Sequence, residues 1–157
     1  MLLSDRQSWD QHFMAHARLA ASRSKDPSTQ VGAVIVGPDR EIRATGFNGF
    51  PRLCSDAPET YADRPRKHLR IVHAEANAVA AAARVGVSLK GCTAYVTAPC
   101  CAQCAALLIQ SGVTAVVWSA DVELRADWLP SLNEAQAMFR EAGVDVVEMR
   151  SQPFVTA

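Results

Sequence analysis

The first periodic feature of the chain is helical. Trp9, Phe13 and Ala17 recur at the spacing of one helix face, so the pattern predicts an amphipathic helix over residues 8–23. The pattern stops at K-D-P-S, because Pro27 disfavours helical geometry at the residue before it. We therefore expect this helix to pack on the core ahead of the first strand.

Two strands and a long irregular segment are expected next. Residues 31–36 form a run of small and β-branched residues, and residues 41–47 alternate between apolar and polar. Together they predict a β-hairpin with its turn at 37–40. Residues 48–70 are rich in proline, aspartate and arginine and show no clean period, which predicts an irregular loop. A loop of this length inside a compact domain is usually functional or poorly ordered.

Helical and strand patterns alternate through the rest of the chain. We expect helices at 73–84, 101–111 and 132–142, and strands at 93–97, 113–118 and 144–149. Alternation of this kind is typical of an α/β fold whose later strands are parallel. A chain of 157 residues is long enough for one sizeable core and too short for two ordinary domains. We therefore expect residues 1–157 to form a single domain.

Composition narrows the class of partner. The 16 basic and 16 acidic residues cancel, whereas proteins that bind a nucleic-acid polymer usually carry a basic excess. The first ten residues lack the basic and apolar regions of a signal peptide, and no apolar run approaches the roughly eighteen residues that span a bilayer. Five cysteines in such a chain indicate reduced thiols and a cytoplasmic location. Clustered cysteines there more often bind metal or perform chemistry than form disulfides.

Two short motifs carry the candidate chemistry. H-A-E at 73–75 and C-A-Q-C at 101–104 each begin an expected helix directly after an extended segment. His73, Cys101 and Cys104 would supply one imidazole and two thiolates, a known set for a catalytic zinc site that keeps an open position for water. The free N–H groups and the positive dipole end of a first helical turn favour the thiolate form that zinc requires.

Spacing alone leaves the cysteine pairing open. Cys100 and Cys104 would share a helix face almost as well as Cys101 and Cys104. Pro99 favours extended geometry just before the helix, which places Cys100 in the entry turn and Cys101 in the helix itself. We expect Cys100 to be a small, partly buried residue.

Glu75 is the more diagnostic residue. It can approach the same metal centre without serving as a ligand, and a carboxylate beside a zinc-bound water can take a proton and deliver it to a leaving group. Its neighbours in sequence are almost all apolar, which predicts an enclosed carboxylate that requires a reason to be there. Zinc-dependent nucleobase deaminases are known to use this layout, with a histidine, two cysteines and a non-ligating glutamate.

Five segments carry a resemblance to a known family. They are R-S-K-D-P-S-T-Q-V-G-A-V-I-V at 23–36, G-F-N-G-F-P at 46–51, V-H-A-E-A-N-A at 72–78, G-C-T-A-Y-V-T at 91–97 and C-A-Q-C-A-A-L-L-I-Q-S-G at 101–112. In this order they resemble the deoxycytidylate (dCMP) deaminases of the zinc-dependent cytidine deaminase superfamily, over about residues 13–149. The resemblance assigns the zinc cysteines to Cys101 and Cys104. It departs at Cys100, where the family usually has proline.

The resemblance implies a fold and a reaction. The fold would be a three-layer α/β/α sandwich around a central five-stranded mixed sheet, in a homo-oligomer with one Zn²⁺ per subunit. The reaction would be hydrolytic deamination of dCMP to dUMP and ammonia, in which zinc-bound hydroxide attacks C4 of cytosine and Glu75 shuttles protons. Many relatives are regulated by dCTP and dTTP.

Substrate contacts are also implied by the resemblance. Asn48 corresponds to the family's nucleotide-contacting asparagine, and the backbone of Ala74 would face the base. Asn48 with its following glycine also suits a simple turn. Residues 64–70 hold four basic side chains and a histidine, which suit either a phosphate or a solvated loop.

Two other functions stay open from the sequence. One is a deaminase acting on another nucleoside, nucleotide or base, including adenosine in tRNA. The other is a non-catalytic, zinc-stabilised binding module, in which Cys54, Cys92 or Cys100 would complete a closed four-ligand site. Trp118 and Trp128 are interpreted as core or interface residues.

Overall fold

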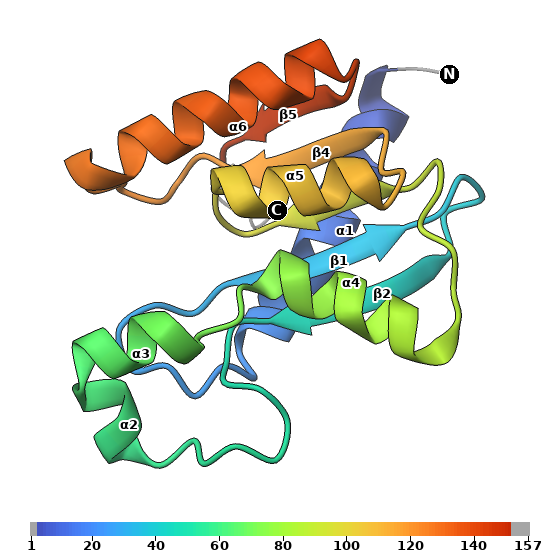
Figure 1. Cartoon of the computed structure of the whole chain (residues 1–157). Coiled ribbons are helices and arrows are strands. Elements are labelled where there is room, and N and C mark those ends of the chain that lie inside the picture. Colours follow the sequence, from blue (N-terminus) through green and yellow to red (C-terminus); the bar gives the residue numbers. More distant parts are fainter. Residues whose placement is uncertain (1–2, 152–157) are drawn as a thin grey trace, which may run out of the picture.

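The structure is a computed structural model that describes the backbone of residues 3–151 and the side chains of residues 9–151, so the ends of the expected 1–157 domain lie outside it. Its centre is one five-stranded sheet in the order β2-β1-β3-β4-β5 (Figure 1). The strands are β1 (Gly32–Val36), β2 (Ile42–Phe47), β3 (Thr93–Val96), β4 (Ala115–Ser119) and β5 (Asp145–Met149). β1 is antiparallel to β2 and β3, whereas β3, β4 and β5 are parallel. The mixed sheet and the parallel later strands are confirmed.

Helices cover both faces of the sheet (Figure 1). Helix α1 (Leu3–Ala21) lies on one face. Helices α4 (Ala74–Val85), α5 (Ala102–Gln110) and α6 (Leu129–Glu141) lie on the other. The expected three-layer α/β/α sandwich is therefore confirmed.

Strand β1 contributes side chains to two hydrophobic cores, one on each face of the sheet. All five of its residues are buried. Val34 and Val36 join the core under α1, and Ala33 and Ile35 join the larger core under the other helices. Side chains alternate between the faces of a strand, so a strand covered on both faces is a continuous apolar run rather than an alternating one.

One glycine allows helix α4 to approach the sheet closely. A Cβ atom at Gly46 of β2 would lie 2.2 Å from the carbonyl oxygen of Ala74 and 2.5 Å from the backbone nitrogen of Ala78. No side chain fits at such distances, so only glycine permits this contact. The contact seats the first turn of α4, which carries the H-A-E motif, against the end of β2.

The expected irregular loop at 48–70 is partly wrong. The structure places two short helices there, α2 (Pro58–Ala62) and α3 (Arg64–Arg70). Each has a proline in its first turn, where the missing N–H is not needed for an intrahelical hydrogen bond. Asp63 caps α3 by accepting a hydrogen bond from the N–H of Arg66. Prolines that suggested a loop are therefore helix starts.

Two helices begin earlier than expected. Helix α6 begins at Leu129, one turn earlier than expected, with proline in its first turn and a short 3-10 helix, η1 (Ala126–Trp128), before it. Helix α1 begins at Leu3 rather than near residue 8. No helix within residues 3–151 is long and apolar enough to cross a membrane.

Strand directions gather several loops at one edge of the sheet. The carboxyl ends of β3 and β4 lie at this edge, together with the amino end of β1 and the carboxyl end of β2, because β1 runs antiparallel to β3. Segments 24–31, 97–101 and 120–128 therefore converge with the start of α4. Ligand sites in open α/β sheets are typically found at such carboxyl edges.

Candidate active site

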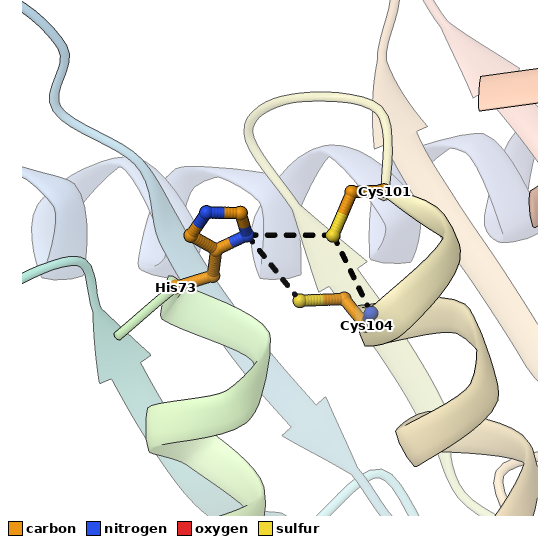
Figure 2. A group of neighbouring side chains, drawn as sticks. All are labelled: His73, Cys101 and Cys104. Atoms are coloured by element: carbon orange, nitrogen blue, oxygen red, sulfur yellow. Dashed lines mark hydrogen bonds between the residues drawn. The ribbon is translucent and has the colours of Figure 1, made fainter. Parts of the chain in front are cut away.

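Two helix starts bring three ligand atoms together. His73 is the N-cap residue of α4, and Cys101 is the N-cap residue of α5. The Nδ1 atom of His73 lies 3.5 Å from the Sγ atoms of both Cys101 and Cys104 (Figure 2). No other histidine, cysteine or carboxylate within the described side chains joins this group, whose ligand atoms lie within 4.8 Å of one another.

The position of Cys101 differs from expectation. The sequence predicted that Cys101 lies in the helix itself, whereas α5 begins one residue later, at Ala102. As the N-cap residue, Cys101 uses its Sγ atom to accept a hydrogen bond from the N–H of Cys104, at 3.4 Å. The thiol therefore takes the capping role that serine or aspartate usually fills. The two sulfur atoms still lie within 4.8 Å of each other.

The spacing of the three atoms fits zinc. A tetrahedral zinc ion with a Zn–N bond of about 2.0–2.1 Å and a Zn–S bond of about 2.3 Å separates nitrogen and sulfur by about 3.5–3.6 Å. Both nitrogen–sulfur distances are 3.5 Å. Imidazole and thiolate are ligands that zinc prefers. Three protein ligands would leave the fourth tetrahedral position open to solvent or substrate.

The pKa values of His73, Cys101 and Cys104 shift in different directions. The hydrogen bond between the two thiols stabilises the Cys101 thiolate and lowers the pKa of Cys101 to about 4, with a further contribution from His73. The same hydrogen bond raises the pKa of Cys104. The hydrogen bond to Cys101 raises the pKa of His73. A divalent cation would displace the protons that remain on the trio.

Glu75 is buried beside this trio. Its side chain is only 4% exposed, and burial raises the pKa of its carboxyl group. The expected enclosure is therefore confirmed. Cys100 is fully buried rather than partly buried as expected, and its thiol lies against Glu75, where it lowers the pKa of that carboxyl group and offsets part of the effect of burial. Cys100 thus contacts the carboxyl group and is not part of the metal-ligand group.

A cavity of about 590 Å³ opens at this edge of the sheet. It contains most of the site residues proposed from the sequence: His73, Ala74, Glu75, Cys101 and Asn48 all line it. Cys104 does not line the cavity. It approaches His73 from the first turn of α5. The converging loops supply the other walls.

Asn48 lines the cavity, but its amide group binds the neighbouring loop. Its Oδ1 atom accepts a hydrogen bond from the N–H of Val31 at 2.8 Å, and its Nδ2 atom donates to the carbonyl oxygen of Thr29 at 2.8 Å. The side chain is 5% exposed. Asn48 therefore shapes the wall formed by segment 24–31, and its contact with a nucleotide stays a prediction.

Helix α3 turns one face toward the cavity. Arg64, Lys67 and His68 line the cavity, and they share a helix face because they are three and four residues apart. Arg66 and Arg70 do not line it. The basic stretch is therefore divided between a cavity side and a solvent side, which its sequence alone did not reveal.

Lys67 is neutralised by a buried acid that sequence reasoning missed. Its Nζ atom lies 2.7 Å from Oδ2 of Asp26, which is 2% exposed. Burial alone would raise the pKa of Asp26, but hydrogen bonds from Lys67, Ser28 and Thr29 outweigh it and lower that pKa. The K-D-P-S stretch holds Asp26, but it was interpreted as a helix stop and as part of a family segment, and neither interpretation gave this aspartate a role.

Trp128 is the other residue that sequence reasoning missed. Trp118 is fully buried in the core as expected, but Trp128 is 38% exposed and lines the cavity. Its ring is stacked over the ring of His73, with centroids 6.1 Å apart and an interplanar angle of 22°. Its place in segment 120–128, which follows the carboxyl end of β4, was the signal that could have located it.

Comparison with protein families gives a match over most of the chain. Residues 7–120 match the model described as the cytidine and deoxycytidylate deaminase zinc-binding region. This range contains Glu75 and the metal-ligand group, which consists of His73, Cys101 and Cys104.

Two curated relatives align over most of the chain. A protein of Aliivibrio fischeri, named an uncharacterised deaminase in the luxG 3' region, is 42% identical over 139 residues, covering 88% of this chain and 91% of its own. The deoxycytidylate deaminase of Homo sapiens is 37% identical over 147 residues, covering 89% of this chain and 79% of its own.

A solved structure shows the same fold. The dCMP deaminase of the cyanophage S-TIM5, crystallised in complex with dCMP and dUMP, superposes with a TM-score of 0.71. The superposition covers 95% of this chain and 99% of the cyanophage chain, at 24% identity. At this identity the similarity establishes the architecture.

Proposed function

The chain belongs to the cytidine and deoxycytidylate deaminase family, and from this premise we propose that it hydrolyses dCMP to dUMP and ammonia. The human relative that aligns over most of the chain is a deoxycytidylate deaminase. The observation that carries the proposal in this chain is the burial of Glu75 beside the group of His73, Cys101 and Cys104 in one cavity.

One Zn²⁺ per subunit is the cofactor that the ligand set supports. His73, Cys101 and Cys104 would hold it, in agreement with the nitrogen–sulfur distances of 3.5 Å. Bound there, zinc would act as a Lewis acid and lower the pKa of a water molecule in its open coordination position.

Glu75 is the residue that moves protons in this reaction. Its carboxylate accepts a proton from the attacking water and delivers it to N3 of cytosine, and then assists the departure of ammonia from C4. Burial raises the pKa of Glu75 and so helps the carboxyl group to hold the proton between these steps. The neighbouring Cys100 thiol lowers the same pKa and so limits the rise.

Replacement of Glu75 tests the proposed mechanism. We expect Glu75→Gln to reduce kcat for dCMP by about a hundredfold or more, the usual contribution of a general acid–base group, while zinc content is unchanged. Ammonia release and atomic absorption measure the two quantities. Glu141→Gln, an exposed position at the end of α6, is the matched control and should match the parent. A Glu75→Gln variant that turns over normally would exclude this role.

Arg64 is proposed to bind the substrate's phosphate. It lines the cavity from α3, and among the described side chains it forms no ion pair. Lys67 lines the same wall but is paired with Asp26. An arginine fork suits phosphate because it donates two parallel hydrogen bonds.

Comparison of dCMP with deoxycytidine tests the phosphate contact. We expect Arg64→Ala to lower kcat/KM for dCMP by about tenfold, because a hydrogen bond to a charged group contributes about 1.5 kcal/mol or more. The rate with deoxycytidine should not change. Arg66→Ala removes an arginine from the same helix that does not line the cavity, and it should leave both rates unchanged. If the parent has the same kcat/KM for dCMP and for deoxycytidine, Arg64 does not bind the substrate's phosphate.

A substrate panel tests the nearest alternative. A deaminase of another nucleoside, nucleotide or base would use the same metal-ligand group, so ammonia release across cytosine and purine compounds separates these activities. The binding-module alternative requires a fourth protein ligand. Among the described residues, Cys54, Cys92 and Cys100 all lie outside the metal-ligand group, which weighs against that alternative.

Several further expectations stay predictions. They are the contacts of Asn48 and the backbone of Ala74 with the nucleotide, the homo-oligomer, the cytoplasmic location and regulation by dCTP and dTTP. Ala74 is fully buried and lines the cavity, which is compatible with a backbone contact to the base.

A further inference from the structure

A second pair of metal-ligating side chains lies on α1, away from the candidate active site. His12 and His16 are one helical turn apart, and their Nε2 atoms are 3.2 Å apart. His12 is exposed and His16 is half-buried. Neither lines the 590 Å³ cavity, and neither belongs to the group of His73, Cys101 and Cys104.

The separation of the two nitrogen atoms suits a shared ion. With metal–nitrogen bonds of about 2.0–2.1 Å, two nitrogen atoms 3.2 Å apart subtend an angle of about 100° at the metal. This angle lies between octahedral and tetrahedral values. Two histidines four residues apart on one helix face are also the arrangement with which zinc metalloproteases hold their ion. The helix therefore sets the geometry before any ion binds.

We propose that His12 and His16 form a surface site for a divalent transition-metal ion that prefers imidazole, such as Ni²⁺. Both Nε2 atoms coordinate through their lone pairs, and the ring protons then reside on the Nδ1 atoms. Binding replaces the single hydrogen bond that joins the rings. Water completes the coordination, so the affinity is moderate.

Neighbouring aromatic rings restrict the His12 side chain, and the fluorescence of one of them can detect a bound ion. The ring of Phe13 lies 5.1 Å from that of His12, and the ring of Trp9 lies 5.5 Å from it in an edge contact. These contacts restrict the His12 ring, which lowers the entropy lost when an ion binds. Because Trp9 is so close, a paramagnetic ion at this site will quench its fluorescence.

Titration of the zinc-loaded, reduced full-length protein with Ni²⁺ tests the proposal. Calorimetry should detect one Ni²⁺ per chain, with parallel quenching of tryptophan fluorescence. His12→Ala and His16→Ala should each weaken Ni²⁺ binding by about a hundredfold, because the second ligand acts at high effective concentration. The double variant keeps neither imidazole and should bind Ni²⁺ more weakly than either single variant. Alanine favours helix, so α1 should be preserved, as circular dichroism would verify.

Two matched controls separate this site from other metal-binding groups. His68→Ala removes an exposed histidine of α3, and Cys54→Ser removes an exposed thiol. Both variants should bind Ni²⁺ like the parent. The proposal is overturned if either histidine of the pair can be removed without loss of affinity, or if Ni²⁺ binding is lost in either control. The result does not depend on deaminase activity.

Discussion

Trp128 shows how one exposed side chain acts on the site. Its indole covers a face of the His73 ring and borders the cavity. Contact with the indole restricts the orientation of the His73 imidazole. Contacts between aromatic rings contribute about 0.5–1.5 kcal/mol beyond the area that they bury.

Substitution of Trp128 should lower activity without loss of zinc. We expect Trp128→Ala to reduce kcat/KM for dCMP by about tenfold, which corresponds to about 1.4 kcal/mol, and Trp128→Phe to recover most of it. The control is Trp9→Ala, because Trp9 is similarly exposed, at 36%, and lies on α1 away from the cavity. If Trp128→Ala retains the parental kcat/KM, the stacked ring has no part in the reaction.

At the scale of elements, one buried ion pair joins helix α3 to the loop before β1. Asp26 receives hydrogen bonds from the N–H groups of Ser28 and Thr29 and pairs with Lys67. Asn48 approaches the same carboxylate with its Nδ2 atom, at 3.4 Å. The pair therefore connects three segments of the cavity wall that are distant in sequence.

Loss of the Asp26 charge should destabilise the protein strongly. We expect Asp26→Asn to lower the free energy of unfolding at pH 7 by about 3 kcal/mol, because it leaves the ammonium group of Lys67 largely buried and unpaired. Asp56→Asn breaks the exposed pair between Lys25 and Asp56 and should cost far less, because solvent screens an exposed ion pair. Urea unfolding measures both values. A cost for Asp26→Asn no larger than for Asp56→Asn would show that the buried pair is unimportant.

The pH dependence of the same pair has a defined sign. Because the folded-state pKa of Asp26 is lowered from 3.8, its charge contributes stability fully above pH 3.8 and loses that contribution as the pH falls through the folded-state value. The difference in stability between the parent and Asp26→Asn should therefore shrink in acid below pH 3.8. A difference that stays constant down to low pH would contradict the charge-based account.

At the scale of the whole molecule, the metal-ligand group joins two helices that follow different strands. His73 precedes α4, and Cys101 and Cys104 lie at the start of α5 (Figure 2). An ion held there would cross-link the two helix starts. Binding to the folded state alone raises its stability by about 2.7 kcal/mol when free metal is a hundredfold above its dissociation constant.

Removal of zinc should therefore lower the Tm of the parent. We expect chelation to lower it by several degrees and restoration of zinc to reverse the change. Cys104→Ala, which loses one ligand, should have a low Tm that responds little to chelator or zinc. Differential scanning calorimetry measures these values, with zinc content determined in parallel. A parent whose Tm does not respond to chelation, despite complete loss of zinc, would exclude a structural contribution of the ion.

Local sequence determined much of this protein. The buried run of β1, the start of α4 at H-A-E and the chemistry of Glu75, His73 and the cysteines depend on side-chain pattern and ligand type, which are properties of short segments. The order of the five strands and of helices α1, α4, α5 and α6 was therefore predictable. Prolines were misleading at α2 and α3 because the same residue that ends a helix also suits its first turn.

Only the tertiary structure decided which distant residues share the cavity. Strand directions bring segments 24–31 and 120–128 to the helix starts, and this places Asp26 against Lys67 and Trp128 over His73. These contacts span tens of residues, and no local period or propensity encodes them. The sequence by itself determined the reactive groups; the packing of helices on a mixed sheet decided their neighbours, because contact between remote segments depends on the path of the whole chain.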